Sequence, residues 1–136
     1  MNTWCWEYKI DTAEFLDRLT ESAQDKKAEN IVRLDVRGMV SYADYFLIAG
    51  AASPRQVKAI AEAMLDAAKD AKKVVISIEG VASSKWILLD FGDVVAHLFH
   101  SPVRAFYDLE GLWMDAPRLP VPPPRENVPG RVLHQE

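Results

Sequence analysis

The apolar positions of this chain change their spacing several times, and each change predicts a different element. Asp11 and Glu14 have the spacing of a helix capping box, and apolar residues then recur at helical intervals. Residues 53–56 give a second start signal, with serine at the N-cap, proline at the first helical position and glutamine three residues after the serine. An apolar stripe follows this signal. We therefore expect one helix that begins near Asp11 and another over 54–70, the latter among the two longest.

Segments with the character of strands alternate with these helices. Residues 31–37 alternate apolar and charged side chains, which predicts a half-buried strand with Arg33 on its polar side. Residues 45–50 are continuously apolar, as in a strand that is covered on both faces. Three more strands are expected at 74–78, 86–89 and 94–99, of which the last two form a hairpin.

The order of these elements predicts an α/β fold: a mixed sheet of about five strands flanked by helices. The strand–helix–strand unit around 54–70 implies a right-handed parallel crossover. We expect Ile48 and Ile76 in the sheet core, and a last helix or helical turn at 106–113.

Composition fits one domain of 136 residues, of which 49% are hydrophobic and 26% charged. No apolar run reaches the ~18 residues that span a bilayer, and the start does not resemble a secretory signal, so we expect a cytoplasmic location without membrane contact.

Six of the eight prolines lie between 117 and 129, which predicts an extended, solvated tail. We divide the chain into an N-terminal extension (1–11), a domain (12–116) and a proline-rich C-terminal tail (117–136).

Charge and cysteine content exclude several classes of site. A net charge of −4 gives no reason to expect direct, sequence-specific binding of nucleic acid. Cys5 is the single cysteine, so a disulfide within the chain and a zinc site with several thiolates are excluded. His97 and His100 would point to opposite faces of a strand, so we expect no metal between them and interpret His97 as a hydrogen-bonded strand residue.

No motif of catalysis or cofactor binding is present, so we expect no catalytic residue, no cofactor and no enzyme. The tripeptide that begins at Asp90 predicts a turn in which Gly92 has a positive φ and Asp93 accepts local hydrogen bonds. Aromatic and apolar residues gather from Trp86 to Trp113 in numbers that a domain of about 105 residues does not easily bury. Because Trp and Tyr are favoured interface anchors, this pattern indicates a small α/β adaptor.

Several blocks together carry a family resemblance. They are Ala-Asp-Tyr-Phe-x-Ile-Ala at 43–49, Trp-Ile-Leu-Leu-Asp-Phe-Gly-Asp-Val-Val-Ala-His-Leu-Phe at 86–99, and Arg-x-x-Tyr-x-Leu-Glu-x-Leu-Trp at 104–113. In this order they resemble the ribosomal silencing factor family, also called Iojap-like proteins, over about 12–116. The block at 51–56 departs from the family pattern, because a histidine usual before the second helix is absent here.

The resemblance implies a translational repressor with a nucleotidyltransferase-like α/β/α fold that lacks the catalytic carboxylates. Such a protein binds the large ribosomal subunit through ribosomal protein L14 and blocks association with the small subunit under nutrient limitation. It also implies a homodimer when the protein is free. Two alternatives stay open: a nucleotidyltransferase-like domain with residual nucleotide binding, and a generic dimeric adaptor.

The resemblance also assigns residues. The partner-facing aromatic positions of the family match Trp86 and Tyr107, which we expect close together on a partly exposed patch with an acidic neighbour. Further positions in the same two segments are Leu88, Asp90, Leu109, Glu110 and Trp113, of which Leu109 and Trp113 fit a core role equally well. Other motif positions are interpreted as structural: Asp44, Gly80, Gly92, Asp93 and His97.

Overall fold

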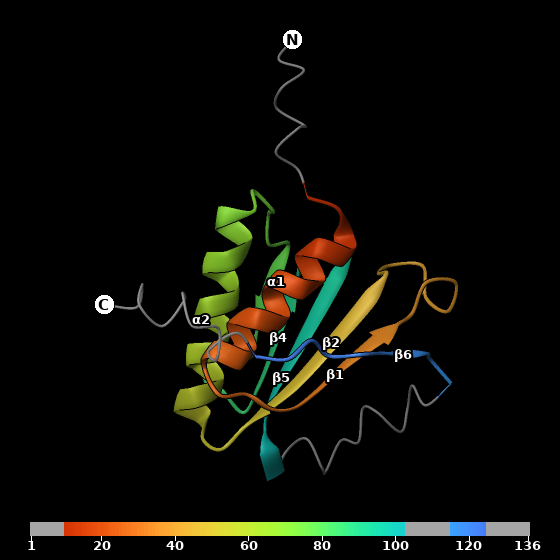
Figure 1. Cartoon of the computed structure of the whole chain (residues 1–136). Helices are drawn as coiled ribbons and strands as arrows, with labels where there is room; N and C mark the ends of the chain where they lie inside the picture. Colours follow the sequence, from red (N-terminus) through yellow and green to blue (C-terminus); the bar gives the residue numbers. More distant parts are fainter. Residues whose placement is uncertain (1–9, 103–114, 125–136) are drawn as a thin grey trace.

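The computed structural model describes residues 10–102 and 115–124 (Figure 1). Their elements are α1 (Thr12–Asp25), β1 (Glu29–Asp35), β2 (Tyr45–Ala51), α2 (Pro54–Asp70), β3 (Ser77–Glu79), β4 (Trp86–Asp90), β5 (Val94–His100) and β6 (Arg118–Leu119). The predicted α/β fold with a mixed sheet is confirmed, and the described residues add a sixth strand to the five expected. The helix expected at 106–113 lies outside the described residues.

Both helices begin at the caps that the sequence predicts. The side chain of Asp11 accepts a hydrogen bond from the backbone N–H of Glu14 at 2.8 Å. The hydroxyl of Ser53 accepts one from the backbone N–H of Gln56 at 3.2 Å, and Pro54 occupies the first turn. These local bonds satisfy N–H groups that have no partner within the helix, and α2 is the longer of the two described helices.

The strands lie in the order β3-β4-β5-β2-β1-β6. The β2–β5 pair is parallel and the other pairs are antiparallel. It follows that β3 runs in the same direction as β2, as expected for the two ends of a crossover through α2. However, β4 and β5 lie between them, so β3 forms an edge of the sheet.

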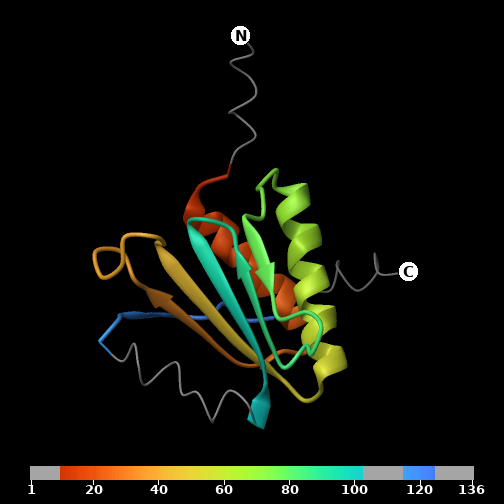
Figure 2. The same cartoon turned by 180° about the vertical axis from the view of Figure 1, so that it is seen from behind.

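Both described helices cover the same face of the sheet, called here the helix face (Figure 1). Figure 2 views the opposite face, called here the far face. The helix face buries side chains of α1 and α2 against alternate residues of the strands, such as Leu47, Ile87 and Leu98. The far face has its own buried cluster: Leu34, Val36, Ala43, Phe46, Ile48, Val95, Phe99 and Ala116.

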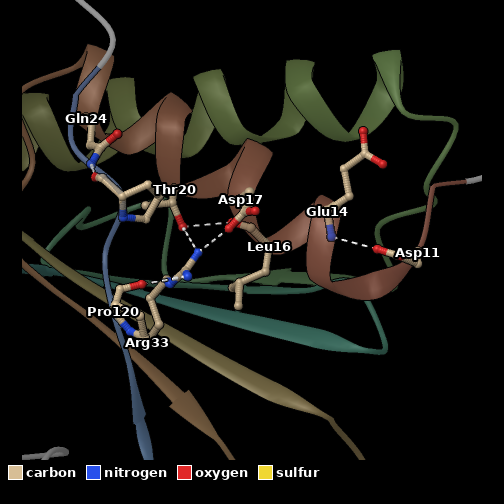
Figure 3. Close-up of polar contacts among 9 residues, drawn as sticks. Asp11, Glu14, Leu16, Asp17, Thr20, Gln24, Arg33 and Pro120 are labelled. Atoms are coloured by element: carbon tan, nitrogen blue, oxygen red, sulfur yellow. Dashed lines mark hydrogen bonds and ion pairs between the residues drawn. The ribbon is translucent and has the colours of Figure 1, made fainter.

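Arg33 lies on the polar side of β1, as the alternation predicts, but that side is not solvated. The side chain is buried on the helix face beneath α1 (Figure 3). Its guanidinium donates to the Asp17 carboxylate at 2.6 Å, to the Thr20 hydroxyl at 3.4 Å and to the Pro120 carbonyl at 2.7 Å. The charge is thus compensated by partners from two distant segments, which strand alternation alone could not reveal.

The proline-rich segment is extended, as predicted, and residues 117, 118, 120 and 121 are exposed, but residues 117–122 are docked on the domain and do not form a separate tail. The carbonyl of Pro117 accepts from the backbone N–H of Asp35 at 2.9 Å, and the carbonyl of Pro122 accepts from the amide of Gln24 at 2.6 Å. Between these contacts, β6 pairs with β1 at the sheet edge. Proline is tolerated there because an edge strand leaves one row of backbone groups unpaired.

At the opposite edge the sequence predicts a longer strand than the structure contains. The strand expected at 74–78 is present only as β3 at Ser77–Glu79. Ile76 is 66% exposed, so its placement in the sheet core is wrong, whereas Ile48 is fully buried as expected. Both residues belong to apolar runs, and only the position of each strand in the sheet decides which is covered.

Candidate partner-binding face

The strand β4 divides its side chains between the two faces. Ile87 and Leu89 point into the helix face and are fully buried. Trp86 and Leu88 pack on the far face, where both are half-buried, and Asp90 shares their side of the strand. Three of the seven residues that the sequence assigned to partner binding therefore lie in a row on one strand.

The turn after β4 fixes this row. Gly92 has a φ of 91°, as predicted, and its backbone N–H donates to a carboxylate oxygen of Asp90 at 2.8 Å. The local acceptor is therefore Asp90, and the expectation that Asp93 serves as the local acceptor is wrong for its side chain. The Asp93 carboxylate instead accepts from the Thr12 hydroxyl at 3.1 Å and lies 3.8 Å from the Lys73 ammonium. Asp93 thus joins the turn to the start of α1 and to the segment that follows α2.

The loop before β4 also positions Trp86. Gly80 has a φ of 88°, and a Cβ at this position would collide with the carbonyl oxygen of Trp86. The backbone N–H of Ser84 donates to the Gly80 carbonyl at 2.9 Å and closes the loop. Glycine is required here because it permits both the left-handed φ and the close backbone approach.

Aromatic rings form a continuous row across the far face. The Trp86 ring centroid lies 4.8 Å from that of Phe99 and 6.3 Å from that of His97. His97 meets Phe46 edge-to-face at 5.4 Å, and Phe46 lies 6.2 Å from Tyr42. Tyr42 is 61% exposed, so the row runs from the half-buried Trp86 to an exposed ring at the β1–β2 loop. The sequence showed the aromatic density, but only the strand order places these rings side by side.

His97 lies within this row as a neutral side chain. It is 7% exposed, and burial lowers the pKa of its imidazole to about 4. Its Nδ1 has no hydrogen-bond partner among the described residues, so the interpretation of His97 as a hydrogen-bonded residue is wrong for that atom.

His100 lies on the helix-face side of β5, where its Nε2 is 3.1 Å from the carbonyl oxygen of Ala52. The two histidines therefore point to opposite faces, as the alternation predicts. Across the two described ranges, no three His, Cys, Asp or Glu residues come close enough to hold a metal ion.

The remaining partner-binding candidates are Tyr107, Leu109, Glu110 and Trp113, and all four lie outside the described residues. The closeness of Trp86 and Tyr107 therefore stays a prediction.

A polar hollow lies between α1 and α2. Its lining includes Glu21, Asp25 and Asp70, with Arg18 as the one basic side chain in that lining. Three carboxylates beside one guanidinium do not favour a phosphate group, so this hollow gives no support to residual nucleotide binding. No described helix is both long enough and apolar enough to cross a bilayer.

Comparisons with known proteins converge on one family. The model of the family described as "Ribosomal silencing factor during starvation" matches residues 9–136. A ribosomal silencing factor of Halalkalibacterium halodurans is 42% identical over 110 residues, which cover 81% of this chain and 94% of that protein. One from Bacillus subtilis is 46% identical over 96 residues, covering 71% and 81%.

A crystal structure from Bacillus halodurans has a TM-score of 0.72 at 38% identity and covers 80% of this chain and 99% of that one. The family match extends beyond the 12–116 expected from the motifs and includes the proline-rich segment that docks on β1. Sequence, fold and relatives agree, and the chain belongs to the ribosomal silencing factor family.

Proposed function

We propose that this chain represses translation by binding the large ribosomal subunit through ribosomal protein L14 and blocking association with the small subunit under nutrient limitation. Membership of the family supports the coarser statement, a regulatory protein that silences ribosomes. The finer statement, with its named partner, rests on the resemblance of the blocks at 86–99 and 104–113.

The observation that carries the proposal is the half-buried pair Trp86 and Leu88 on the far face. Both side chains stand on a regular hairpin whose other face is locked into the core. Phe99 supports the Trp86 ring from the neighbouring strand. A tryptophan held in this way loses little conformational freedom on binding, which is why such residues dominate interface energetics.

Electrostatics favours a basic protein partner. The chain carries a net charge of −4, and Asp90 flanks the aromatic row. Ribosomal proteins are mostly basic, so the field of an acidic factor speeds its encounter with them and repels exposed RNA. The contribution is to association rate and salt dependence more than to affinity.

The resemblance supports three further parts of the proposal. The free chain forms a homodimer, it acts in the cytoplasm, and its action needs neither an enzymatic step nor a cofactor.

Sedimentation tests the proposal. Purified large subunits are mixed with the chain, small subunits are added, and the mixture is resolved on a sucrose gradient. We expect the chain to migrate with the large subunit and joined ribosomes to be depleted. The Trp86→Ala variant should weaken both effects, whereas Lys58→Ala on the exposed side of α2 should retain them.

Each of three other outcomes would contradict one part of the proposal. Migration at the top of the gradient, with joined ribosomes unaffected, would contradict ribosome binding. Binding to the large subunit with normal joining would contradict the blocking step alone. An equal loss of large-subunit binding in the Trp86 and Lys58 variants would show that the far face is not the specific binding site.

A further inference from the structure

The loop between β1 and β2 carries two large apolar side chains that face solvent. Tyr42 is 61% exposed and Met39 is 43% exposed. Neither belongs to the residues that the sequence assigned to partner binding. Figures 1 and 2 both show this loop, in orange, extending past the strands that it joins. Single exposed apolar side chains are ordinary on a protein surface, so a role for these two requires that they continue a larger patch.

The backbone anchors this loop at several points. The N–H groups of Met39 and Val40 donate to the carbonyl of Val36 at 3.0 and 3.2 Å. The N–H of Val36 donates to the carbonyl of Asp44 at 2.9 Å, and the N–H of Asp44 donates to that of Asp93 at 2.7 Å. Val40 also packs against the buried cluster of the far face. The exposed side chains are thus presented from an anchored backbone, which reduces the entropy lost when a partner immobilises them.

Tyr42 continues the aromatic row of the far face. Its ring lies 6.2 Å from that of Phe46, which belongs to the buried far-face cluster. From Phe46 the row continues to His97 at 5.4 Å and from His97 to Trp86 at 6.3 Å. The exposed ring of Tyr42 and the half-buried ring of Trp86 are therefore the two ends of one row.

A partner that covers one end of this row also reaches the other. A protein–protein interface of standard size buries about 800 Å² on each partner, which corresponds to a patch roughly 30 Å across. The three steps from Trp86 to Tyr42, none longer than 6.3 Å, fit within such a patch. Tyrosine, tryptophan and methionine are also among the residue types enriched in interfaces.

The charges near Tyr42 favour the same kind of partner. Residues 35–44 carry two acidic side chains and one basic side chain. The basic one, Arg37, is paired with Asp35 at 2.7 Å and lies over the ring of Tyr45 at 5.3 Å. Asp44 is partly exposed, as is Asp90 on β4. The loop therefore adds negative charge to the far face, which complements a basic protein surface.

We propose that Tyr42 and Met39 form a second anchor of the partner-binding face, covered by the same basic ribosomal protein that covers Trp86. The inference rests on the proposed function and extends it, because the β1–β2 loop lies outside the two segments, 86–99 and 104–113, to which the resemblance assigned partner contacts. In the complex the partner packs on the exposed side of the Tyr42 ring, and Phe46 supports that ring from beneath.

Methionine oxidation tests this contact in the wild-type chain. Met39 is exposed, whereas Met64 is fully buried and serves as an unreactive reference. The chain is treated with dilute hydrogen peroxide, either free or pelleted with saturating large subunits, and methionine sulfoxide is located by mass spectrometry after digestion. We expect Met39 to be oxidised at least about fivefold more slowly in the bound chain. In a Lys58→Met variant, the added methionine on the exposed side of α2 should be oxidised equally fast in both states.

The outcomes separate this inference from the proposed function. Equal oxidation of Met39 in the free and the pelleted chain would overturn the inference alone, because the pellet itself demonstrates binding. A chain that does not pellet with large subunits would overturn both. Protection of Met39 that rises with the concentration of the chain alone, without further protection on the large subunit, would assign the loop to a second copy and overturn the inference.

Truncation of the tyrosine gives an independent measurement. Tyr42→Ala should weaken binding to the large subunit by at least about fivefold, whereas Tyr42→Phe keeps the ring and should stay within about twofold of the wild type. Val74→Ala is the matched control, because Val74 is 78% exposed and lies between α2 and β3, near the opposite edge of the sheet. Melting temperatures of all three variants verify folding. Wild-type affinity in a folded Tyr42→Ala chain would overturn the proposal.

Discussion

The two faces of the sheet are built from alternate residues of the same strands, yet they differ in side-chain type and in exposure. On the helix face, β4 and β5 present Ile87, Leu89, Ala96 and Leu98, all aliphatic and at most 1% exposed. On the far face the same strands present Trp86, Leu88, His97 and Phe99, which are aromatic or partly exposed.

Under the proposed function, one hairpin carries both stability and recognition. Aliphatic side chains fill the space beneath two helices, where shape complementarity matters. Aromatic side chains offer large, rigid contact areas at little entropic cost, which suits a surface that receives a partner. Because the faces alternate residue by residue, a substitution on one strand tests either purpose separately.

The largest effect is expected on the helix face. Leu89→Ala should lower the free energy of unfolding by about 2–5 kcal/mol, because it leaves a cavity beneath the helices. Urea denaturation measures this loss. A cost below about 1 kcal/mol would mean that the helix face is loosely packed and that the contrast between the faces is false.

The next effect concerns the buried imidazole of the far face. Burial lowers the pKa of His97 to about 4, below the ~6.5 of an unfolded chain, so only the unfolded state binds this proton between those values. Above pH 6.5 the imidazole is neutral in both states and does not lower the free energy of unfolding. As the pH drops from 6.5 to 4, proton binding to the unfolded state lowers the free energy of unfolding by about 3 kcal/mol.

Unfolding free energies of the wild type and of His97→Phe, measured from pH 7 to pH 4, isolate this contribution. The variant should show a shallower decline, while carboxylates that titrate in both proteins cancel in the comparison. Parallel declines would show that His97 is not held neutral by burial.

Trp86→Ala should weaken binding to the large subunit by roughly 1–3 kcal/mol, the usual range for an interface anchor. Its cost to unfolding should be smaller than that of Leu89→Ala, because the ring is already partly exposed. A thermal melt and a pelleting assay on the same variants separate the two effects. A melting temperature far below that of the wild type would show that Trp86 is a core residue. A normal melting temperature with normal pelleting would show that the far face is not the binding site.

The smallest effect is expected for Asp90→Asn. The amide oxygen still accepts from the N–H of Gly92, so the turn survives and unfolding should change by less than about 0.5 kcal/mol. Only the charge is lost, which should slow association with large subunits at low salt and leave the rate at high salt unchanged. Association rates at two ionic strengths measure this difference. A rate that falls equally at both would indicate a contact of Asp90 other than long-range steering.

The local features of the fold were open to prediction from sequence. The caps at Asp11 and Ser53, the stripe along α2 and the glycine turn at Gly92 depend on residues within a few positions of one another. The alternation of side chains along β4 likewise assigns Trp86 and Ile87 to opposite faces, because successive residues of a strand point in opposite directions. Each signal is local because the hydrogen bonds and side-chain directions that produce it are local.

The tertiary structure decided everything that depends on which segments meet. Arg33 and Ile76 both lie in segments that the sequence predicts as strands, yet one is buried beneath α1 and the other is exposed just before the edge strand β3. The pairing of β6 with β1 joins residues more than 80 positions apart, and the aromatic row gathers rings from the β1–β2 loop and three strands. Side-chain type and spacing within a segment determine its secondary structure. Burial depends on which distant segments pack against it, and that is determined by the free energy of the whole chain.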